Sequence, residues 1–406
     1  MKLLWVKAGK ILPVDTGGKI RTINILRQLA RRHEVHFLSY YGGLRDAAYE
    51  RALVQEFPHA IPIANAWPTG PVGQGLAYLR TFPSGTPFAV GKFTHAAVRD
   101  RVQAIYDARS VDVAVCDFLA ATGNFPRDLT VPTALFQHNV ESALWDRQAT
   151  HETRFGLRTV YRIEAARMAT YEAEAVRRFH HVIAVSEVDK AQMARWVDAS
   201  RISVTPTGVD LEQFGADAGT SGDAKPLVVF VGSMDWEANS DGIDWFCRDV
   251  WPLVATSNSA AVLRVVGRNP PARIRELASA HVEVTGTVPS VVEHLHAAAV
   301  VIVPLRIGGG TRLKIYEAMA ARRPVVSTTI GAEGLDVTHD RDIVLADEPA
   351  AMADRIVRLL ADPAERARIG DAAAATASRF AWPSVTRDFE SSLELARSAG
   401  TPAGAR

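Results

Sequence analysis

The stretch RIGGGTRLKIYEAMAARRPVV (306–326) carries the residue types that bind a phosphate group. Three consecutive glycines lead into two cations, Arg312 and Lys314. Glycines let a backbone approach an anion closely, because they carry no Cβ. Cations in the first turn of a helix oppose the helix dipole at a cost of about 0.3–1 kcal/mol each, and a bound phosphate reverses that cost. The stretch therefore predicts an anion site formed by backbone amides and the two cationic side chains. The amides expected there are those of Gly309, Gly310 and Thr311.

A single glutamate, Glu317, follows one helical turn after Lys314. Two interpretations of it stay open from spacing alone. Its carboxylate is expected to accept hydrogen bonds from a ribose diol, or else to form an i,i+3 ion pair with Lys314, which is a common surface arrangement.

The elements around this stretch are those of an open parallel sheet. A strand is expected over 300–305, a helix over 311–323 and the next strand over 324–329. In open α/β sheets, ligands bind beyond the carboxyl ends of the strands. A helix N-terminus at that edge offers free N–H groups and about half a positive charge. The glycine loop therefore lies where such a fold binds its ligand.

Short β-rich apolar runs alternate with helical patterns along almost the whole chain. A strand at 2–8, an amphipathic helix at 17–32 and a strand at 34–40 form a βαβ unit, and this unit repeats. The alternation predicts an α/β fold with parallel sheets covered by helices on both faces. A stretch rich in Gly, Ala and Asp interrupts it at 208–226. We therefore expect two doubly wound, Rossmann-like domains that face each other across a cleft. Further strands are expected at 111–116, 133–137, 181–185, 202–206, 227–233, 261–267, 281–286 and 342–346.

The predicted boundaries are 1–207 for the first domain, 208–226 for a linker and 227–380 for the second domain. The remaining residues, 381–406, are expected to form a helix and a tail, with the helix packing back on the first domain. The segment 67–88 follows no clear pattern and stays unassigned.

Composition excludes several classes of protein. The 406 residues are 48% hydrophobic and 22% charged, which is typical of a globular enzyme. No apolar run reaches the roughly 20 residues of a transmembrane helix, and the N-terminus reads as a strand rather than a signal peptide. With only Cys116 and Cys247, a reducing cytoplasm is expected. No stretch resembles a nucleic-acid-binding module.

Charge is distributed unevenly. Residues 1–207 carry 26 Lys and Arg against 19 Asp and Glu, whereas the remainder carries 20 against 26. In the predicted helix 151–180, Arg154, Arg158 and Arg162 recur every four residues. This pattern fits either peripheral contact with an anionic membrane surface or acceptor, or an ordinary solvated face with interspersed glutamates.

Several motifs together resemble the retaining GT-B glycosyltransferases, in particular the large family four of sugar transferases. LKIYEAMAARRPVVSTTIGAEGL resembles the nucleotide-sugar element of that family, and VFVGSMDWEANSDGIDWF resembles the opening of its second domain. In the order that the family requires, the chain also contains PVDTGGKIRTINILRQLARRHEV, VIAVSEVDK and TPTGVDLEQF. The likeness covers nearly the whole chain and is strongest over 182–335.

The resemblance implies a hexosyltransferase that moves sugar from a nucleotide diphosphate sugar to an acceptor hydroxyl, with the acceptor in the first domain and the donor in the second. His138 follows the strand at 133–137, where the family's histidine touches the donor sugar, and it is expected to act with Arg312 and Lys314 in catalysis. The expected donor contacts are Gly17, Gly18, Gly232, Asn239, Arg268, Gly309, Gly310, Thr311 and Glu317. The expected acceptor contacts are Lys19, Asn139 and Glu141.

Some of these assignments have alternatives from the residues alone. Gly17 and Gly18 form either an anion site or an ordinary turn between strand and helix, and Arg268 is either a donor contact or a surface arginine. The chain also departs from the family pattern, because Gly309 stands where the family often has the first of two glutamates eight positions apart. The identity of the donor is therefore open.

We expect no metal and no cofactor. The single Asp-x-Asp, at Asp340 and Asp342, lies well after the glycine loop and reads as a solvated turn. Fixed positive charge is then expected to stabilise the leaving diphosphate. Two other functions remain: a sugar-nucleotide epimerase or hydrolase on the same two-domain frame, and a non-catalytic nucleotide-sugar binder.

Overall fold

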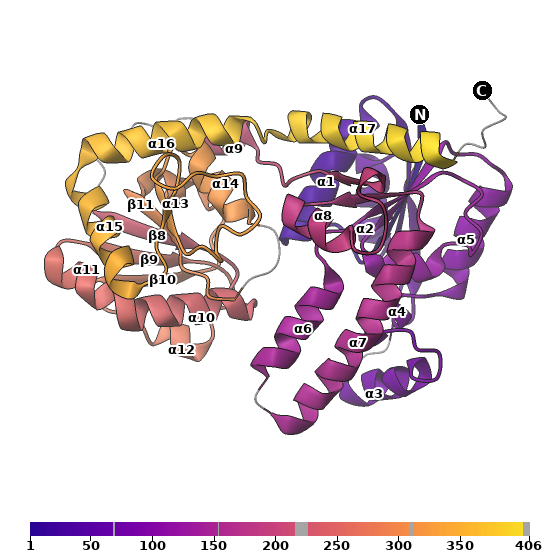
Figure 1. The fold of residues 1–406 in the computed structure, drawn as a ribbon, viewed down its shortest axis with the longest axis horizontal. Helices are drawn as coiled ribbons and strands as arrows, with labels where there is room; N and C mark the ends of the chain where they lie inside the picture. Colours follow the sequence, from indigo (N-terminus) through magenta and orange to yellow (C-terminus); the bar gives the residue numbers. More distant parts are fainter. Residues whose placement is uncertain (68–69, 153, 216–225, 308–311, 401–406) are drawn as a thin grey trace. The chain divides into compact units, whose positions relative to one another are not determined.

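The computed structural model forms two compact units, which are described separately (Figure 1). The first unit comprises Met1–Pro206 together with the residues from Val385 onward, and the second comprises Thr207–Ser384. Among the described residues, no helix is both long enough and apolar enough to cross a bilayer. The residues that the structure describes are 1–67, 70–152, 154–215, 226–307 and 312–400.

The N-terminal unit is built on a seven-stranded parallel sheet with the strand order β3-β2-β1-β4-β5-β6-β7. The central strands are apolar along most of their length, because a sheet covered on both faces leaves no strand side in water. The order places β1 beside β4, with Lys7 paired in register with Asp117. The strands are β1 (Lys2–Ala8), β2 (Glu34–Gly42), β3 (Ile61–Asn65), β4 (Val113–Asp117), β5 (Thr133–Phe136), β6 (His181–Ala184) and β7 (Ile202–Val204). The helices are α1 (Gly17–Ala30), α2 (Ala47–Glu56), α3 (Gly70–Thr81), α4 (Phe88–Gly91), α5 (Ala96–Asp107), η1 (Leu119–Asn124), α6 (Glu141–His151), α7 (Phe155–Arg178), α8 (Glu187–Met193) and η2 (Ala199–Arg201).

The C-terminal unit contains a six-stranded parallel sheet with the order β10-β9-β8-β11-β12-β13. Helices α10, η4, α11 and α15 pack into one core with residues of β8, β9, β11 and β12, and α14 packs against α16. The strands are β8 (Leu227–Val231), β9 (Val262–Val266), β10 (Val282–Gly286), β11 (Val300–Val303), β12 (Val325–Ser327) and β13 (Val344–Leu345). The helices are α9 (Leu211–Gly215), α10 (Glu237–Trp245), η4 (Phe246–Val250), α11 (Trp251–Ser257), α12 (Ala272–Arg275), α13 (Val292–Ala297), α14 (Leu313–Ala320), α15 (Pro349–Ala361) and α16 (Pro363–Ser378).

The last helix, α17 (Trp382–Gly400), begins in the C-terminal unit and continues along the N-terminal unit. Phe389 of this helix stacks on Trp5 of β1, with ring centroids 5.4 Å apart, and packs edge-on against Phe136 of β5. The hydroxyl of Ser203 in β7 donates a hydrogen bond to the hydroxyl of Ser392 at 2.7 Å. Helix α17 therefore contributes to the core on one side of the first sheet.

Several elements differ in extent from the sequence expectation. The expected helix 311–323 is shorter, since α14 spans Leu313–Ala320. Part of the segment expected to be a linker is helical, because α9 lies within it, and Val209 forms a bridge with Ala381. The unassigned segment 67–88 contains α3, and strand β3 had no clear sequence signal.

Candidate functional site

A buried carboxylate organises the carboxyl edge of the first sheet. The side chain of Asp117, at the end of β4, accepts hydrogen bonds from Trp5 Nε1 at 3.0 Å and from Thr22 Oγ1 at 2.7 Å. Lys7 Nζ lies 3.2 Å from the same carboxylate oxygen. The other oxygen lies 2.8 Å from Nε2 of His138. Strands β1, β4 and β5 and helix α1 thus meet at one anion.

Asp117 determines which nitrogen of His138 carries the proton. Burial alone raises the pKa of Asp117, but Lys7 and His138 hold this pKa well below its usual range. The carboxylate is therefore ionised and accepts a hydrogen bond from the N–H at Nε2, which leaves Nδ1 of the neutral ring as an acceptor. Burial lowers the pKa of His138 to about 3, so the ring is neutral at physiological pH.

The His138 ring is fixed between aromatic side chains and α1. It stacks on Phe118 with centroids 3.7 Å apart and planes at 15°, and it lies 4.3 Å from Phe136. Phe118 has φ of +74°, a left-handed conformation that non-glycine residues rarely adopt. A Cβ added to Gly18 would lie 3.0 Å from Cζ of Phe118 and 3.9 Å from Nδ1 of His138. Only glycine allows α1 to begin this close to the histidine.

The N-terminus of α1 has no acidic residue in its first turn and no side-chain cap. Gly17 and Gly18 begin the helix, and Lys19 is held by Asp15 at 2.8 Å and by the carbonyl of Pro13 at 3.1 Å. Arg21, in the next turn, is buried, and its Nε and Nη1 have no hydrogen-bond partner among the described residues. Burial lowers the pKa of Arg21 to about 10, and nearby carboxylates oppose this shift, so the side chain stays charged. Positive potential is concentrated at this helix end.

The N-terminus of α6 is already occupied by an internal anion. Glu172 of α7 accepts hydrogen bonds from the backbone N–H of Glu141 at 2.8 Å and of Ser142 at 2.9 Å, and from the hydroxyl of Ser142 at 2.6 Å. Burial and the charge of Glu172 raise the pKa of Glu141 to about 7, and a hydrogen bond with Asn139 lowers it in part. Glu141 is therefore half protonated near neutrality.

A cavity of about 260 Å³ opens beside this cluster. Its polar lining is Lys7, Lys92 and Glu141, and Phe118 forms part of its apolar wall. The ammonium of Lys92 lies 4.8 Å from the centroid of the Phe93 ring, and burial lowers the pKa of Lys92. The cavity can take a small molecule that offers a hydroxyl and polar groups.

In the C-terminal unit, Lys314 lies in the first turn of α14 and points across to β8. Its Nζ donates to Oδ1 of Asn239 at 2.7 Å and lies 4.4 Å from the centroid of the Phe230 ring. Nδ2 of Asn239 donates to the carbonyl of Ser233 at 2.6 Å. A Cβ at Gly232 would lie 2.6 Å from Nζ of Lys314, so a side chain at this position would displace the ammonium group.

The pKa values of Lys314 and Glu317 are shifted in opposite directions, and both end at about 7. Burial lowers the pKa of Lys314 to about 7, with Arg312 lowering it further and Glu317 opposing the shift. Burial raises the pKa of Glu317 to about 7, against the effect of Lys314. In the described part of the chain these two side chains form no ion pair, and the carboxyl of Glu317 has no hydrogen-bond partner. The i,i+3 ion pair considered from spacing is therefore not formed.

Arg312 lies at the N-cap of α14, one residue before the helix. Its side chain is buried, and Nη2 donates to the carbonyl of Ile330 at 3.0 Å and lies 3.9 Å from Glu333. The N–H of Gly331, in the same loop, donates a hydrogen bond to Oγ1 of Thr328 at 2.9 Å. Arg312 thus ties the start of α14 to the loop after β12.

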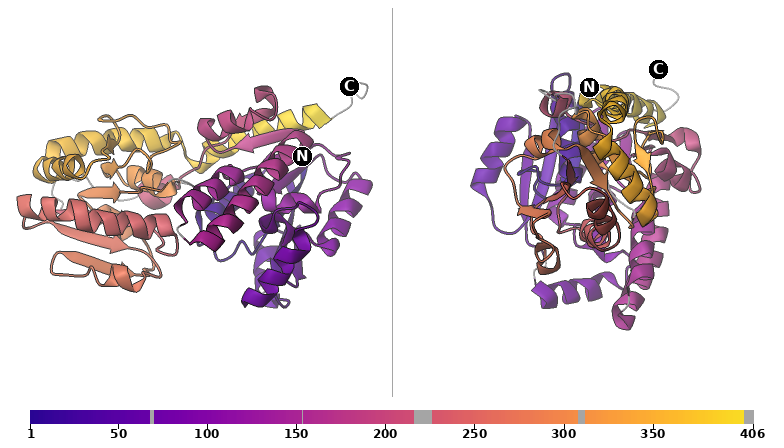
Figure 2. Two further views of the ribbon diagram at one scale, coloured as in Figure 1. Left: turned by 60° about the horizontal axis from the view of Figure 1, so that its bottom comes forward. Right: turned by 90° about the vertical axis from the view of Figure 1, so that its left-hand side faces the viewer.

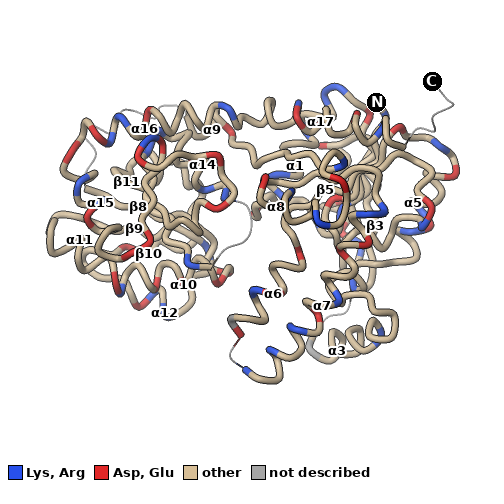
Figure 3. The backbone as a smooth tube through the Cα atoms, in the orientation of Figure 1, with Lys and Arg blue, Asp and Glu red and all other residues tan. Residues whose placement is uncertain are grey.

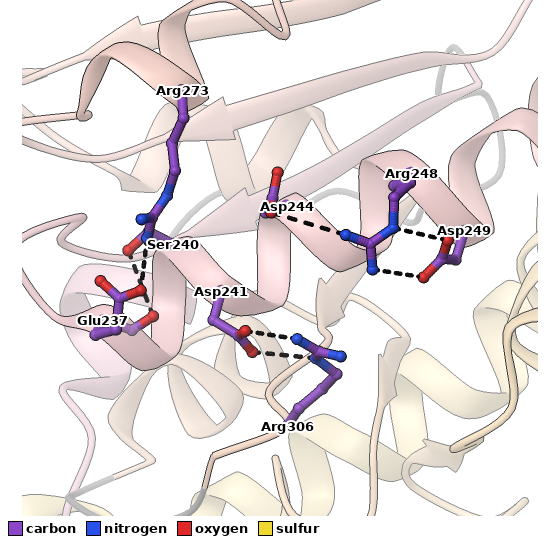
Figure 4. A network of polar contacts seen from close by, with 8 residues as sticks. All are labelled: Glu237, Ser240, Asp241, Asp244, Arg248, Asp249, Arg273 and Arg306. Carbon is purple, nitrogen blue, oxygen red and sulfur yellow. Dashed lines mark hydrogen bonds and ion pairs between the residues drawn. The ribbon is translucent and has the colours of Figure 1, made fainter. Parts of the chain in front are cut away.

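Ion pairs lie close to Gly232 and at Arg306, before the glycine loop. Arg306, which precedes that loop, forms a two-bond ion pair with Asp241 of α10, at 2.5 and 3.1 Å (Figure 4). Arg268, after β9, is 3.0 Å from both Ser233 Oγ and Asp235 Oδ2. The predicted contacts Gly309, Gly310 and Thr311 lie outside the described residues.

Both units thus present a helix N-terminus, a glycine and buried cations at the carboxyl edge of a parallel sheet.

The family model described as Glycosyltransferase Family 4 matches residues 16–213, and the model described as Glycosyl transferases group 1 matches residues 225–362. This chain belongs to the family four, group 1 glycosyltransferases. The resemblance drawn from the motifs is confirmed.

Two curated proteins match parts of this chain. A 44.6 kDa protein in the cps region of Klebsiella pneumoniae is 30% identical over 139 residues, which are 32% of this chain and 36% of that protein. The D-inositol 3-phosphate glycosyltransferase of Xylanimonas cellulosilytica is 28% identical over 207 residues, which are 46% of this chain and 49% of that protein. The matches thus span about a third to a half of these relatives.

A solved structure extends the comparison to nearly the whole chain. Anabaena HepE in complex with UDP superposes with a TM-score of 0.66 at 17% identity, covering 97% of this chain and all of that one. At this identity the likeness shows the fold, and the predicted α/β architecture of two doubly wound domains of GT-B type is confirmed.

Some site residues lay outside the sequence prediction. Lys7, Asp117 and Arg21 form the charged centre of the N-terminal site, and none of them was predicted. Lys7 and Asp117 had a usable signal, since each is a charged residue near the carboxyl end of an otherwise apolar strand. Of the predicted residues, the structure brings together Gly18 with His138, Asn139 with Glu141, and Gly232 with Asn239 and Lys314. It places Lys19 against Asp15 and Arg268 against Asp235.

Proposed function

We propose that this glycosyltransferase moves a hexose from a nucleotide diphosphate sugar to an acceptor hydroxyl, with retention at the anomeric carbon and without a metal ion. The observation that carries the proposal is the position of Lys314. It lies at the start of α14, against Gly232, and is held by the neutral side chain of Asn239 rather than by a carboxylate. Its charge is therefore available to an incoming anion.

The leaving diphosphate is stabilised by fixed positive charge in this proposal. Lys314, Arg312 and the N–H groups that begin α14 surround the diphosphate, together with backbone amides of Gly309, Gly310 and Thr311. Such preorganised charge acts where negative charge develops as the glycosidic bond to phosphate breaks. Arg268 and Asn239 flank this charge, and the carboxylate of Glu317 accepts hydrogen bonds from the ribose hydroxyls.

UDP is the first nucleotide to test. Anabaena HepE has been solved in complex with UDP and with UDP-glucose. HepE shares the fold of this chain at low identity, so UDP-glucose is a starting probe and other nucleotide sugars follow it.

His138 contacts the donor sugar in this proposal. Its neutral ring offers an acceptor at Nδ1, and no donor to this atom exists among the described residues. A sugar hydroxyl satisfies it. Gly17 and Gly18 let the helix end approach the same ligand, and Arg21 adds positive charge behind them.

The acceptor binds in the cavity beside Glu141 in this proposal. Asn139 and Glu141 hold the acceptor hydroxyls, and Lys19 of α1 is close enough to Lys7 in the cavity lining to lower the pKa of Lys7. The acceptor oxygen forms its bond to the anomeric carbon while the bond to the diphosphate oxygen breaks. The hydroxyl proton passes to the departing phosphate oxygen on the same face of the sugar, so no dedicated base is needed.

Product analysis with UDP-glucose and a panel of hydroxyl acceptors, with and without EDTA, tests the proposal. The expected result is an α-linked product that forms only with acceptor and is unaffected by EDTA. Release of free glucose at the same rate without acceptor supports a hydrolase instead, and conversion to another nucleotide sugar supports an epimerase. A donor that binds but is never consumed supports a non-catalytic binder.

A further inference from the structure

Large apolar side chains are exposed in two neighbouring parts of the N-terminal unit. One part is α3 with the residue that follows it, and the other is the start of α7. Monomeric proteins seldom gather such side chains in water, and where they do the surface usually binds something. The side chains are Val72 (78% exposed), Leu76 (55%), Leu79 (65%), Phe82 (52%) and Phe155 (87%).

Helix α3 has an apolar face that no described residue covers. Val72, Leu76 and Leu79 are four and three residues apart, so they share one side of the helix. Arg80 is its one charged residue, and glycines inside the helix weaken it further. A helix of this composition gains stability when its apolar face is covered.

The apolar face of α3 and the start of α7 belong to one region. Arg167 of α7 donates hydrogen bonds to the carbonyls of Thr81 at 2.6 Å and Thr86 at 2.9 Å, and it lies 5.1 Å from the centroid of the Phe82 ring. Figures 1 and 2 show α3 beside the free end of α7. We call α3, Phe82 and residues 155–163 the α3–α7 surface.

Positive charge surrounds the α3–α7 surface. Residues 70–82 and 146–163 contain five arginines, and their acidic residues are Asp146 and Glu152. Glu152 is paired with Arg154 at 2.9 Å. Figure 3 shows mostly blue segments along the free ends of α6 and α7. The arginines are Arg80, Arg147, Arg154, Arg158 and Arg162.

We propose that the α3–α7 surface docks on an anionic lipid bilayer. Exposed aromatic and aliphatic side chains bordered by arginines are the combination that lies in a bilayer interface, with the apolar groups below the headgroups and the cations at the phosphates. Each arginine near such a surface raises the binding constant about fivefold. The proposal does not depend on the glycosyl transfer reaction and concerns a different part of the molecule from its site.

Flotation with lipid vesicles tests this surface without any activity measurement. The full chain is mixed with vesicles of phosphatidylcholine alone or with 40% phosphatidylglycerol, at about 50 and 500 mM salt. Binding is expected only to the anionic vesicles and is expected to weaken at high salt. The triple variant Val72→Ser, Leu76→Ser, Leu79→Ser and the double variant Arg158→Glu, Arg162→Glu are each expected to lower the binding constant more than tenfold.

Matched controls distinguish this surface from general effects. Arg99→Glu, Arg101→Glu makes the same charge change on α5, and Leu395→Ser removes an exposed leucine from α17. Both controls are expected to keep the wild-type binding constant, and circular dichroism checks the fold of every variant. The proposal is overturned if the wild type does not bind anionic vesicles, or if the controls lose as much binding as the test variants. It is also overturned if sedimentation shows a dimer that the triple serine variant abolishes, because a second copy then covers the surface.

Discussion

Protonation of Lys314 provides a test of the diphosphate site that needs no knowledge of the acceptor. Burial, with a contribution from Arg312, lowers the pKa of Lys314 to about 7. A group with this pKa is about nine-tenths protonated at pH 6 and about one-tenth protonated at pH 8. If only the ammonium form binds the diphosphate, the affinity for UDP falls about tenfold as the pH rises across this interval.

Glu317 titrates over the same pH range as Lys314, but its titration has the opposite effect on the affinity for UDP. The effect of Lys314 can therefore be measured only in a variant that lacks Glu317. Burial raises its pKa to about 7, and its ionised form accepts hydrogen bonds from ribose, so its ionisation strengthens binding as the pH rises. We expect a shallow pH profile for the wild type and a clear fall in affinity with rising pH for Glu317→Gln, in which Lys314 also loses the charge that raises its pKa. Adding Lys314→Met should leave only the dependence that comes from the nucleotide's terminal phosphate, whose pKa is about 6.

Isothermal titration calorimetry with UDP at pH 6, 7 and 8 measures these affinities. Repeating the pH 7 titration in buffers of different ionisation enthalpy counts the protons taken up. Glu317→Gln should take up at least half a proton more than the double variant, because Lys314 is at least half neutral at pH 7 once Glu317 no longer raises its pKa. The same pH profile and proton uptake in both variants would refute the assignment of Lys314 to the diphosphate.

Three further predictions follow from the two sites. Gly18→Val should lower the transfer rate at least tenfold, because the new side chain displaces the rings of Phe118 and His138. Gly156→Ala should leave the rate unchanged, because the space around Gly156 is open. Full activity in the valine variant would argue against a ligand at the start of α1. His138 has a pKa of about 3 in the folded protein and about 6.5 in the unfolded chain, so below pH 6.5 the unfolded chain binds a proton that the folded protein does not. The free energy of unfolding should therefore fall as the pH drops below 6.5, by at most about 1.4 kcal/mol per pH unit from this residue. His138→Phe should flatten that slope in urea unfolding of the N-terminal unit, and an unchanged slope would contradict the assigned protonation. Arg306→Ala should weaken UDP binding several-fold by releasing the start of the glycine loop, whereas Arg248→Ala, on the same stretch of chain as Asp241 in Figure 4, should not.

Much of the fold was predictable because its signals are local. Runs of Val and Ile at β8, β11 and β12 are buried on both faces, and such runs alternate with helical patterns. Strand β3 was missed, because its IPIAN sequence is short, half-buried and contains a proline. Helix α3 was missed because its glycines and exposed apolar residues do not follow the usual pattern of a surface helix.

The site was predictable only where a motif marks it. His138 was found from its place at the end of a strand, and Lys314 from its conflict with the helix dipole. The ion pair of Lys7 with Asp117 joins residues 110 positions apart, and it depends on β4 rather than a later strand lying beside β1. Strand order of this kind cannot be read from the periodicity of either segment. The contact of Lys314 with Asn239 has the same origin, since 75 residues separate the two.

The path of α17 has a consequence for how the protein is made. The indole that donates to Asp117 is stacked on Phe389, so the core of the first sheet is complete only after α17 has been synthesised. During translation the N-terminal sheet must persist with an open face while the entire C-terminal unit is synthesised. A premature stop shortly after Ser384 would therefore damage the part of the molecule that was translated first.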